Sequence, residues 1–162
     1  IDLDSPNTAS YIAPLNTSSG ESFMFALRFI FTPQASNSPA IIYADMGNTR
    51  LRYNISTNLY EFIMGADTVS MSAQVNTWIT LIFGRDNSGQ LFIADDGNQG
   101  SVPQVGTTEM IFDNVFRLGL TAGGDIRIGS FQYWKGGILL PISYNFRLVR
   151  NYLKWRFFRF VS

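Results

Sequence analysis

The sequence of 162 residues contains neither cysteine nor histidine. Without cysteine the chain has no disulfide and no thiolate metal site, so its redox compartment stays open. Without histidine it has no imidazole base, which excludes Ser-His and Cys-His nucleophile pairs and histidine metal clusters. These two absences remove the commonest catalytic and metal-binding chemistries.

Long apolar runs are missing too, since no stretch approaches the ~20 residues that a membrane-spanning helix needs. Charged residues make up only 15% of the chain against 46% hydrophobic residues, which is typical of a folded globular protein. The length suits one domain with a substantial core. The N-terminal letters IDLDSPNT show no initiator Met and no signal-peptide pattern, so we expect a mature product or a piece of a longer polypeptide.

The net charge of zero hides two parts of opposite sign. Residues 1–134 carry 12 acidic side chains and six arginines, a net charge of −6, whereas residues 135–162 carry six basic side chains and no acidic one. We therefore expect a sandwich over residues 1–137 and a basic, aromatic tail over residues 138–162, packed together as one domain.

Alternating apolar residues predict strands over most of the chain. In SFMFALRFIF, residues 22–31, every second residue from Phe23 is Phe or Leu, and the other face is also mostly apolar, which indicates a strand buried on both faces. PAIIYAD and TRLRYNI indicate a hairpin, NLYEFIMG and DTVSMSA two shorter strands, and NVFRLGL and DIRIGSFQYW a last hairpin. About ten short strands predict an all-β, two-sheet antiparallel sandwich.

The stretch NTWITLIFGRDNSGQLFIADDG, residues 76–97, reads as two strands joined by a DNSG turn. Trp78 stands at the start of the first strand, and we expect its ring to fill the core. Asp96 and Gly97 are expected to form the next turn. On this interpretation the whole stretch is scaffold.

The tail PISYNFRLVRNYLKWRFFRF favours an amphipathic helix over residues 143–157. Tyr144, Leu148 and Tyr152 recur every four residues, and basic residues fill the opposite face at helical spacing. Pro141 followed by a serine is a reasonable helix start, although alternation at the beginning of the segment also fits a strand. The side chains expected to make assembly or tail contacts are Arg147, Arg150, Lys154, Trp155, Phe158 and Phe160.

Residues 131–162 hold ten aromatic side chains interleaved with arginine, a pattern that also suits single-stranded nucleic acid. The simpler interpretation is that the apolar stripe docks on the acidic sandwich while the basic face meets solvent or a neighbouring subunit. Contact with a membrane surface is a further alternative. We therefore favour docking or assembly over nucleic-acid binding.

The carboxylates are not spaced for glycosidase chemistry on a sheet. Such an enzyme needs two carboxyl groups about 5–10 Å apart, but Glu61 stands alone in its strand, and Asp95 and Asp96 are adjacent in a turn. A lyase would need an arginine beside a tyrosine base, and alternation in RLRYN places both arginines on the face opposite Tyr53. We expect no enzyme activity.

Turns rich in oxygen ligands leave a calcium site open as an alternative. Asp45 with Asn48, or Asp95 and Asp96 with Asn98, supply some of the hard oxygens that calcium needs. Asp and Asn in turns usually serve backbone hydrogen bonds instead. The sequence therefore predicts no cofactor, with calcium as the one candidate.

A ligand site is expected on loops at one rim of the sandwich, because loops carry specificity. The candidates lie in and beside YADMGNTRLRY: Tyr43, Asp45, Asn48 and Arg50. Their planar polar groups can hydrogen-bond hydroxyls, and the Tyr43 ring can stack on a sugar face.

The order of these segments resembles the laminin-G-like, concanavalin-A-like family. SPNTASYIAPLNTSSGESFMFALRFIF resembles its opening strands, NTWITLIFGRDNSGQLFIADDG its block of Trp, strand, turn, strand and Asp-Gly, and GDIRIGSFQYWKGGIL its closing strand. LPISYNFRLVRNYLKWRF resembles its tail helix, but Phe146 stands where that pattern usually has a Glu, which removes the reciprocal capping partner.

Domains of this family are two-sheet jelly rolls that often bind glycans or proteins, sometimes with calcium, and they are frequent in phage and bacterial surface proteins. The resemblance therefore implies a lectin-like, carbohydrate-binding jelly roll on a virion surface or outside the cell, whose partner is a glycan or a surface receptor. The alternative is a structural phage component, such as a tail or head-decoration domain, that uses the fold to assemble with other virion subunits or with itself.

Overall fold

A computed structural model describes residues 2–3, 9–12, 22–34, 40–45, 49–95, 99–101, 115–118 and 124–135. The strands in these residues are β1 (Asp2–Leu3), β2 (Ala9–Ile12), β3 (Phe23–Pro33), β4 (Ala40–Asp45), β5 (Thr49–Asn54), β6 (Leu59–Met64), β7 (Asp67–Ser72), β8 (Trp78–Arg85), β9 (Leu91–Ala94), β10 (Gln99–Ser101), β11 (Val115–Leu118) and β12 (Gly124–Lys135). The predicted tail helix and its contact residues lie outside the described residues. Among the residues that are described, no helix is long and apolar enough to cross a membrane.

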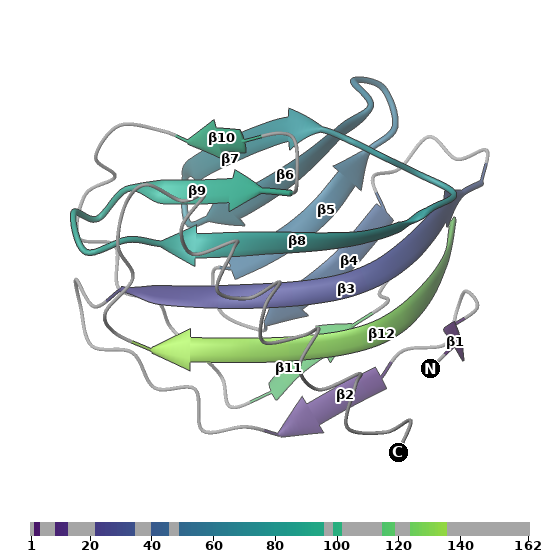
Figure 1. Cartoon of the computed structure of the whole chain (residues 1–162), viewed down its shortest axis with the longest axis horizontal. Helices are drawn as coiled ribbons and strands as arrows, with labels where there is room; N and C mark the ends of the chain where they lie inside the picture. Colours follow the sequence, from purple (N-terminus) through teal and green to yellow (C-terminus); the bar gives the residue numbers. More distant parts are fainter. Residues whose placement is uncertain are drawn as a thin grey trace, which may run out of the picture.

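The strands form a sandwich of two antiparallel sheets (Figure 1). In the described part of the chain, one sheet has the order β1-β12-β3-β8-β9-β10 and the other the order β2-β11-β4-β5-β6-β7. Figure 1 shows the first sheet in front, with the strands of the second sheet crossing diagonally behind it. The predicted all-β, two-sheet antiparallel sandwich is confirmed.

Most of the predicted hairpins are present. Strands β4, β5, β6 and β7 pair in succession, and β8 pairs with β9. The DNSG turn between β8 and β9 is held by Asp86, whose Oδ1 accepts hydrogen bonds from the backbone N–H of Ser88 (2.7 Å) and of Gln90 (2.9 Å). Gly89 has a φ of 81°, a left-handed conformation that suits glycine.

The predicted last hairpin is wrong. Strand β11 pairs with β2 and β4, whereas β12 pairs with β1 and β3 in the opposite sheet. The ladder between β12 and β3 runs from Gly124 opposite Pro33 to Lys135 opposite Phe23. Local alternation cannot distinguish a hairpin from a crossing between sheets, because the long β12–β3 ladder depends on residues far apart in the sequence.

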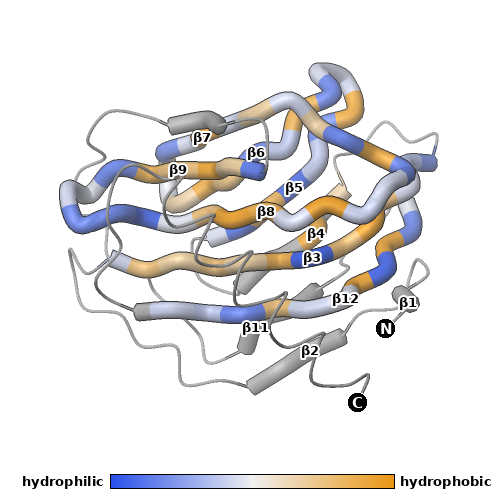
Figure 2. Tube along the Cα trace, in the orientation of Figure 1, coloured by the Kyte–Doolittle hydropathy of each residue, from blue (hydrophilic) through white to orange (hydrophobic). Residues whose placement is uncertain are grey.

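The main core lies between the two sheets and is built on the alternation in β3. Phe23, Phe25, Leu27, Phe29 and Phe31 all point inward and have no exposed surface. Complete burial of each such side chain contributes about 1.5–3 kcal/mol before conformational entropy is subtracted. Figure 2 shows the resulting hydrophobic colouring along β3, β8 and β9.

The outer face of β3 carries a second, smaller cluster at one end. Met24 and Ala26 are buried there with Ile82, Phe92 and Ala94, and Trp134 packs against them. Both faces of β3 are therefore apolar over its first half, as the sequence pattern predicts. Toward the second half, Arg28 and Ile30 are only partly buried.

Candidate ligand-binding site

Of the four candidate ligand residues of the β4–β5 hairpin, the structure describes the strand positions of three. Tyr43 and Asp45 belong to β4, which is paired on both sides, with β5 and with β11. Arg50 is exposed on β5 and lies opposite Ala44 rather than opposite Tyr43 or Asp45. Asn48 lies outside the described residues. The hairpin site therefore stays a prediction that rests on the sequence.

The predicted opposition of arginines and Tyr53 in β5 is confirmed. Leu51 and Tyr53 belong to the core, whereas Arg52 lies on the outer face opposite Glu61 of β6. The Nε of Arg52 donates to Oε2 of Glu61 (2.5 Å), and the side-chain amide of Asn54 donates to Oε1 (2.9 Å). Both oxygens of the isolated glutamate thus serve a hydrogen-bonded cluster that holds β5 and β6 together.

Three aspartates also have structural hydrogen bonds. Besides Asp86 in its turn, Asp95 accepts from the Gln74 amide (3.2 Å), and Asp125 accepts from the Gln34 amide (3.0 Å). Of the calcium candidates, Asp96 and Asn98 lie outside the described residues. Within the described part of the chain, no group of three or more Asp and Glu side chains gathers as a metal site.

Tyr60 is a buried titratable group with a strongly shifted pKa. Its hydroxyl donates to the backbone oxygen of Gln74 (2.6 Å). Burial raises the pKa of Tyr60 far above its ordinary value, and the nearby Tyr53 and Asp95 raise it further. A phenol that keeps its proton in this way ties β6 to the segment after β7 and does not act as a base at neutral pH.

Trp78 is exposed, so the prediction that its ring fills the core is wrong. Ile79, Leu81 and Phe83 take the inward positions of β8, and alternation turns Trp78 to the outer face with 47% of its surface exposed. Trp78 is the only large hydrophobic side chain exposed among the residues whose burial is described. Because a tryptophan combines a large apolar ring with an N–H donor, this exposed side chain is a candidate for ligand contact.

Two rows of side chains cross the outer face of the front sheet around Trp78. In the first row, Trp78 of β8 lies opposite Ile30 of β3, and Ile30 lies opposite Arg127 of β12. Ile30 is partly buried and Arg127 is exposed. The exposed indole thus shares its row with a cation two strands away.

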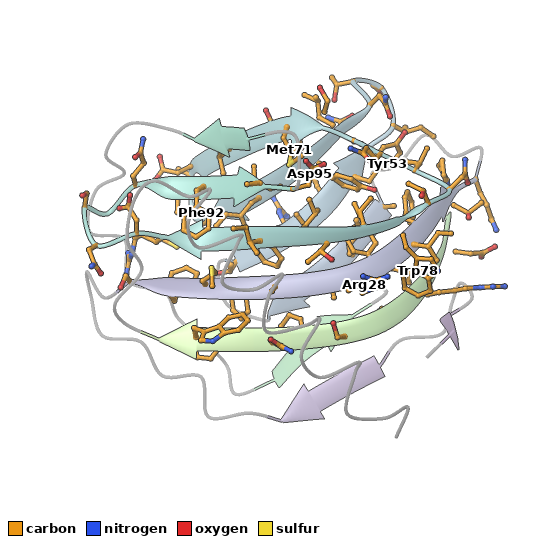
Figure 3. All side chains as sticks on the ribbon, viewed as in Figure 1. Arg28, Tyr53, Met71, Trp78, Phe92 and Asp95 are labelled. Atoms are coloured by element: carbon orange, nitrogen blue, oxygen red, sulfur yellow. The ribbon has the colours of Figure 1, made fainter. Side chains whose placement is uncertain are left out.

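The second row is polar. Thr80 of β8 and Ser130 of β12 both lie opposite Arg28 of β3. The guanidinium carbon of Arg28 lies 5.8 Å from the centroid of the Trp78 ring, within the range of a cation–π interaction. Figure 3 shows Trp78 and Arg28 side by side at one end of the front sheet. Three groups that can donate hydrogen bonds therefore adjoin the exposed indole.

A β-bulge in β12 makes room for the indole. The register of the β12–β3 ladder shifts between Ile128 and Ser130, which leaves Gly129 without a partner in the ladder. A Cβ atom at Gly129 would lie 3.2 Å from Cζ3 of Trp78 and 3.6 Å from Cγ and Cδ of Arg28. Because Gly129 has no side chain, it leaves space for the side chains of Trp78 and Arg28.

Sequence reasoning missed this group, although the sequence contained two signals for it. The alternation of Ile79, Leu81 and Phe83 places Trp78 on the other face. Likewise, the core-facing residues that follow Ile126 and Ile128 are shifted by one position from strict alternation. This shift marks a bulge at the glycine directly after Ile128. We call Trp78, Arg28, Thr80, Gly129 and Ser130 the indole platform.

The fold and the site together define a class of structure. It is an antiparallel sandwich with the aromatic and cationic indole platform on the outer face of one sheet. No family model matches the sequence, and no curated protein is similar to it in sequence. Similar structures exist, however. The binding domain of botulinum neurotoxin DC in complex with rat synaptotagmin II shares 13% identity at a TM-score of 0.73, over 94% of this chain and 42% of that one.

Two further structures are similar to the same degree. One is a structure of botulinum neurotoxin type C, whose cell entry is described as dependent upon interaction with two ganglioside molecules. It has a TM-score of 0.70 and 13% identity over 90% of this chain. The neurotoxin DC binding domain in complex with SialylT has a TM-score of 0.68 and 13% identity over 90% of this chain. The chain spans 41% of the length of each. At this identity the likeness shows the fold.

Proposed function

We propose that the protein is a non-catalytic binding module that recognises carbohydrate. The observation that carries this proposal is the exposed Trp78, held flat on a sheet face beside side chains that donate hydrogen bonds. An indole face gives a sugar ring an apolar surface for its C–H groups, and neighbouring donors hold its hydroxyls. The structurally similar neurotoxin structures, described with ganglioside and SialylT, support the proposal.

Four of the described carboxylates have structural roles. Glu61, Asp86, Asp95 and Asp125 each accept structural hydrogen bonds. Catalysis of glycoside cleavage would require two carboxyl groups that face one substrate, one with a raised pKa. In this arrangement the acidic groups stabilise turns and strand pairs.

The finer assignment follows from the resemblance of the sequence. We propose a jelly roll of the laminin-G-like, concanavalin-A-like kind that acts on a virion surface or outside the cell, where its partner is a glycan or a surface receptor.

Assembly with other virion subunits or with a second copy is the alternative function. Tryptophan and arginine are enriched among the residues that dominate protein–protein interfaces, and the platform contains both. The six positive charges over residues 135–162 are a feature of the sequence that would also favour such contacts.

A glycan array probed with and without calcium, beside a measurement of molecular size, tests the proposal. We expect the protein to bind a defined subset of glycans as a monomer. A silent array together with a defined oligomer would favour assembly and reject carbohydrate binding. Binding that disappears on calcium removal would identify calcium as a cofactor.

A further inference from the structure

We infer that the indole platform is a subsite for an acidic sugar: the pyranose ring stacks on Trp78, and its carboxylate accepts hydrogen bonds from Arg28. This inference rests on the proposed carbohydrate binding and adds the site and the chemical class of the ligand. It follows from the orientation of the indole, from the charges around it and from the end of the sheet at which they lie.

The indole reaches across the outer face of the sheet and stays partly exposed. Trp78 belongs to β8, yet its Cζ3 atom lies 3.2 Å from the point that a Cβ atom of Gly129 in β12 would occupy. Because β3 lies between β8 and β12, the ring must cross the outer surface of β3. The ring therefore lies over β3 with the Arg28 guanidinium carbon 5.8 Å from its centroid, and 47% of the side chain stays exposed.

The electrostatics around the ring favour an anion at its edge. The π-face of an indole is electron-rich, so it attracts the C–H groups of a sugar and repels a carboxylate. The guanidinium of Arg28 lies 5.8 Å from the ring centroid, where a substituent of a stacked ring can reach it. A guanidinium binds a carboxylate through two parallel hydrogen bonds more strongly than it binds a neutral hydroxyl.

Other groups of the same sheet end agree with this ligand. Arg127 is exposed in the row of Trp78, where it lies opposite Asp2 of β1, and the carboxylate of Asp125 on the same strand accepts a hydrogen bond from Gln34. The hydroxyls of Thr80 and Ser130 flank Arg28 and can bind sugar hydroxyls. Together these side chains offer stacking, an ion pair and two further hydrogen bonds to one ring.

A flat platform contacts one ring, so single-site binding should be weak and strengthened by multivalent display. The titrants are 3′-sialyllactose and tetragalacturonate, which carry a carboxylate on a pyranose, and lactose and maltotetraose, which do not. Binding is measured by titration calorimetry and by the indole N–H signals of the three tryptophans in ¹H–¹⁵N spectra, assigned with Trp→Phe variants. We expect at least one acidic sugar to shift the Trp78 signal and to bind at least about tenfold more tightly than the neutral sugars.

Four variants of the full chain locate the site. Trp78→Ala and Arg28→Gln should each weaken acidic-sugar binding by about tenfold or more while the melting temperature changes little. Gly129→Val should also weaken it, because a side chain there displaces the indole without deleting it. Trp134→Phe is the matched control, since Trp134 packs against the apolar cluster of the same sheet face and should bind as the parent protein does.

The outcomes separate this inference from the proposed function. Acidic-sugar binding that survives Trp78→Ala and Arg28→Gln would overturn the assignment of the site to the platform and leave carbohydrate binding intact. A fifth variant, Arg50→Gln, tests the other candidate site: loss of binding in this variant alone would move the site to the β4–β5 hairpin. Equal binding of neutral and acidic sugars would overturn the ligand class. No binding of any of the four sugars, with a silent glycan array, would overturn the proposed function and the inference together.

Discussion

Replacement of Phe25 by alanine should produce one of the largest stability losses available in this core. Phe25 has no exposed surface and lies near the start of β3, directly opposite Phe83 of β8 and Tyr133 of β12. Its ring centroid is 5.3 Å from that of Phe83, 5.0 Å from that of Tyr133 and 5.6 Å from that of Phe131. The side chain therefore joins three strands of the front sheet.

The expected loss follows from the transfer and cavity terms. A buried Phe→Ala change costs about 3–5 kcal/mol, and aromatic pairs contribute about 0.5–1.5 kcal/mol each beyond the buried area. Because the neighbouring rings of Phe25 can partly relax into the space, we expect about 4–5 kcal/mol for Phe25→Ala. This is a large share of the roughly 5–15 kcal/mol that stabilises a typical domain, so the melting temperature should fall by about 10–20 °C.

Urea denaturation followed by fluorescence measures the change in the free energy of unfolding. Thr32→Ala is the matched control, because Thr32 is exposed on the same strand and its replacement should stay within about 0.5 kcal/mol. Phe25→Leu should fall between the two. A loss below about 2 kcal/mol for Phe25→Ala, with an unchanged m-value, would contradict the placement of this ring at the junction of β3, β8 and β12.

Four further changes test other parts of the structure. Gly84→Ala should destabilise the protein by at least about 1–3 kcal/mol in urea denaturation, because its Cβ would lie 2.1 Å from the backbone oxygen of Phe23. Glu61→Ala should cost about 1–2 kcal/mol in the same assay, because the partly exposed Arg52 loses a charged hydrogen bond. Above about pH 10 the unfolded chain releases the phenol proton of Tyr60 while the folded chain retains it, so stability should fall with rising pH, and Tyr60→Phe should reduce that slope from about pH 10 upward. Truncation after Gly137 should lower solubility and the melting temperature if the tail docks as its sequence predicts, whereas an equally stable monomer would identify the tail as an interaction arm.

The strand pattern was predictable from the sequence because the core of this protein is built on period-two alternation. In β3 the alternation runs through five inward residues, four of them Phe, and the structure buries all five. The pairing of distant strands was not predictable in the same way. Alternation indicates on which face of its sheet a residue lies, but it does not indicate which sheet a strand joins. For that reason the sequence wrongly predicts that β11 pairs with β12.

The candidate site was predicted less well than the fold, for a physical reason. A tryptophan gains so much from burial that its size alone argues for the core. Its position in β8 argues otherwise, because Ile79 already holds the inward place at that end of the strand. When the bulk of a side chain and its strand parity conflict, parity decides, since the backbone cannot rotate one residue without turning its neighbours to the wrong face.

The outer face of the front sheet shows how one surface can serve stability and binding separately. At one end Met24, Ala26 and Phe92 are buried in an apolar cluster, and a polar substitution there would cost stability. At the other end Trp78 and Arg28 rest on the backbone of Gly129, above a core that Ile79 and Phe29 fill without them. On the proposed function, substitutions in the platform should therefore change ligand binding while leaving folding almost unchanged, as a recognition surface on a rigid sandwich requires.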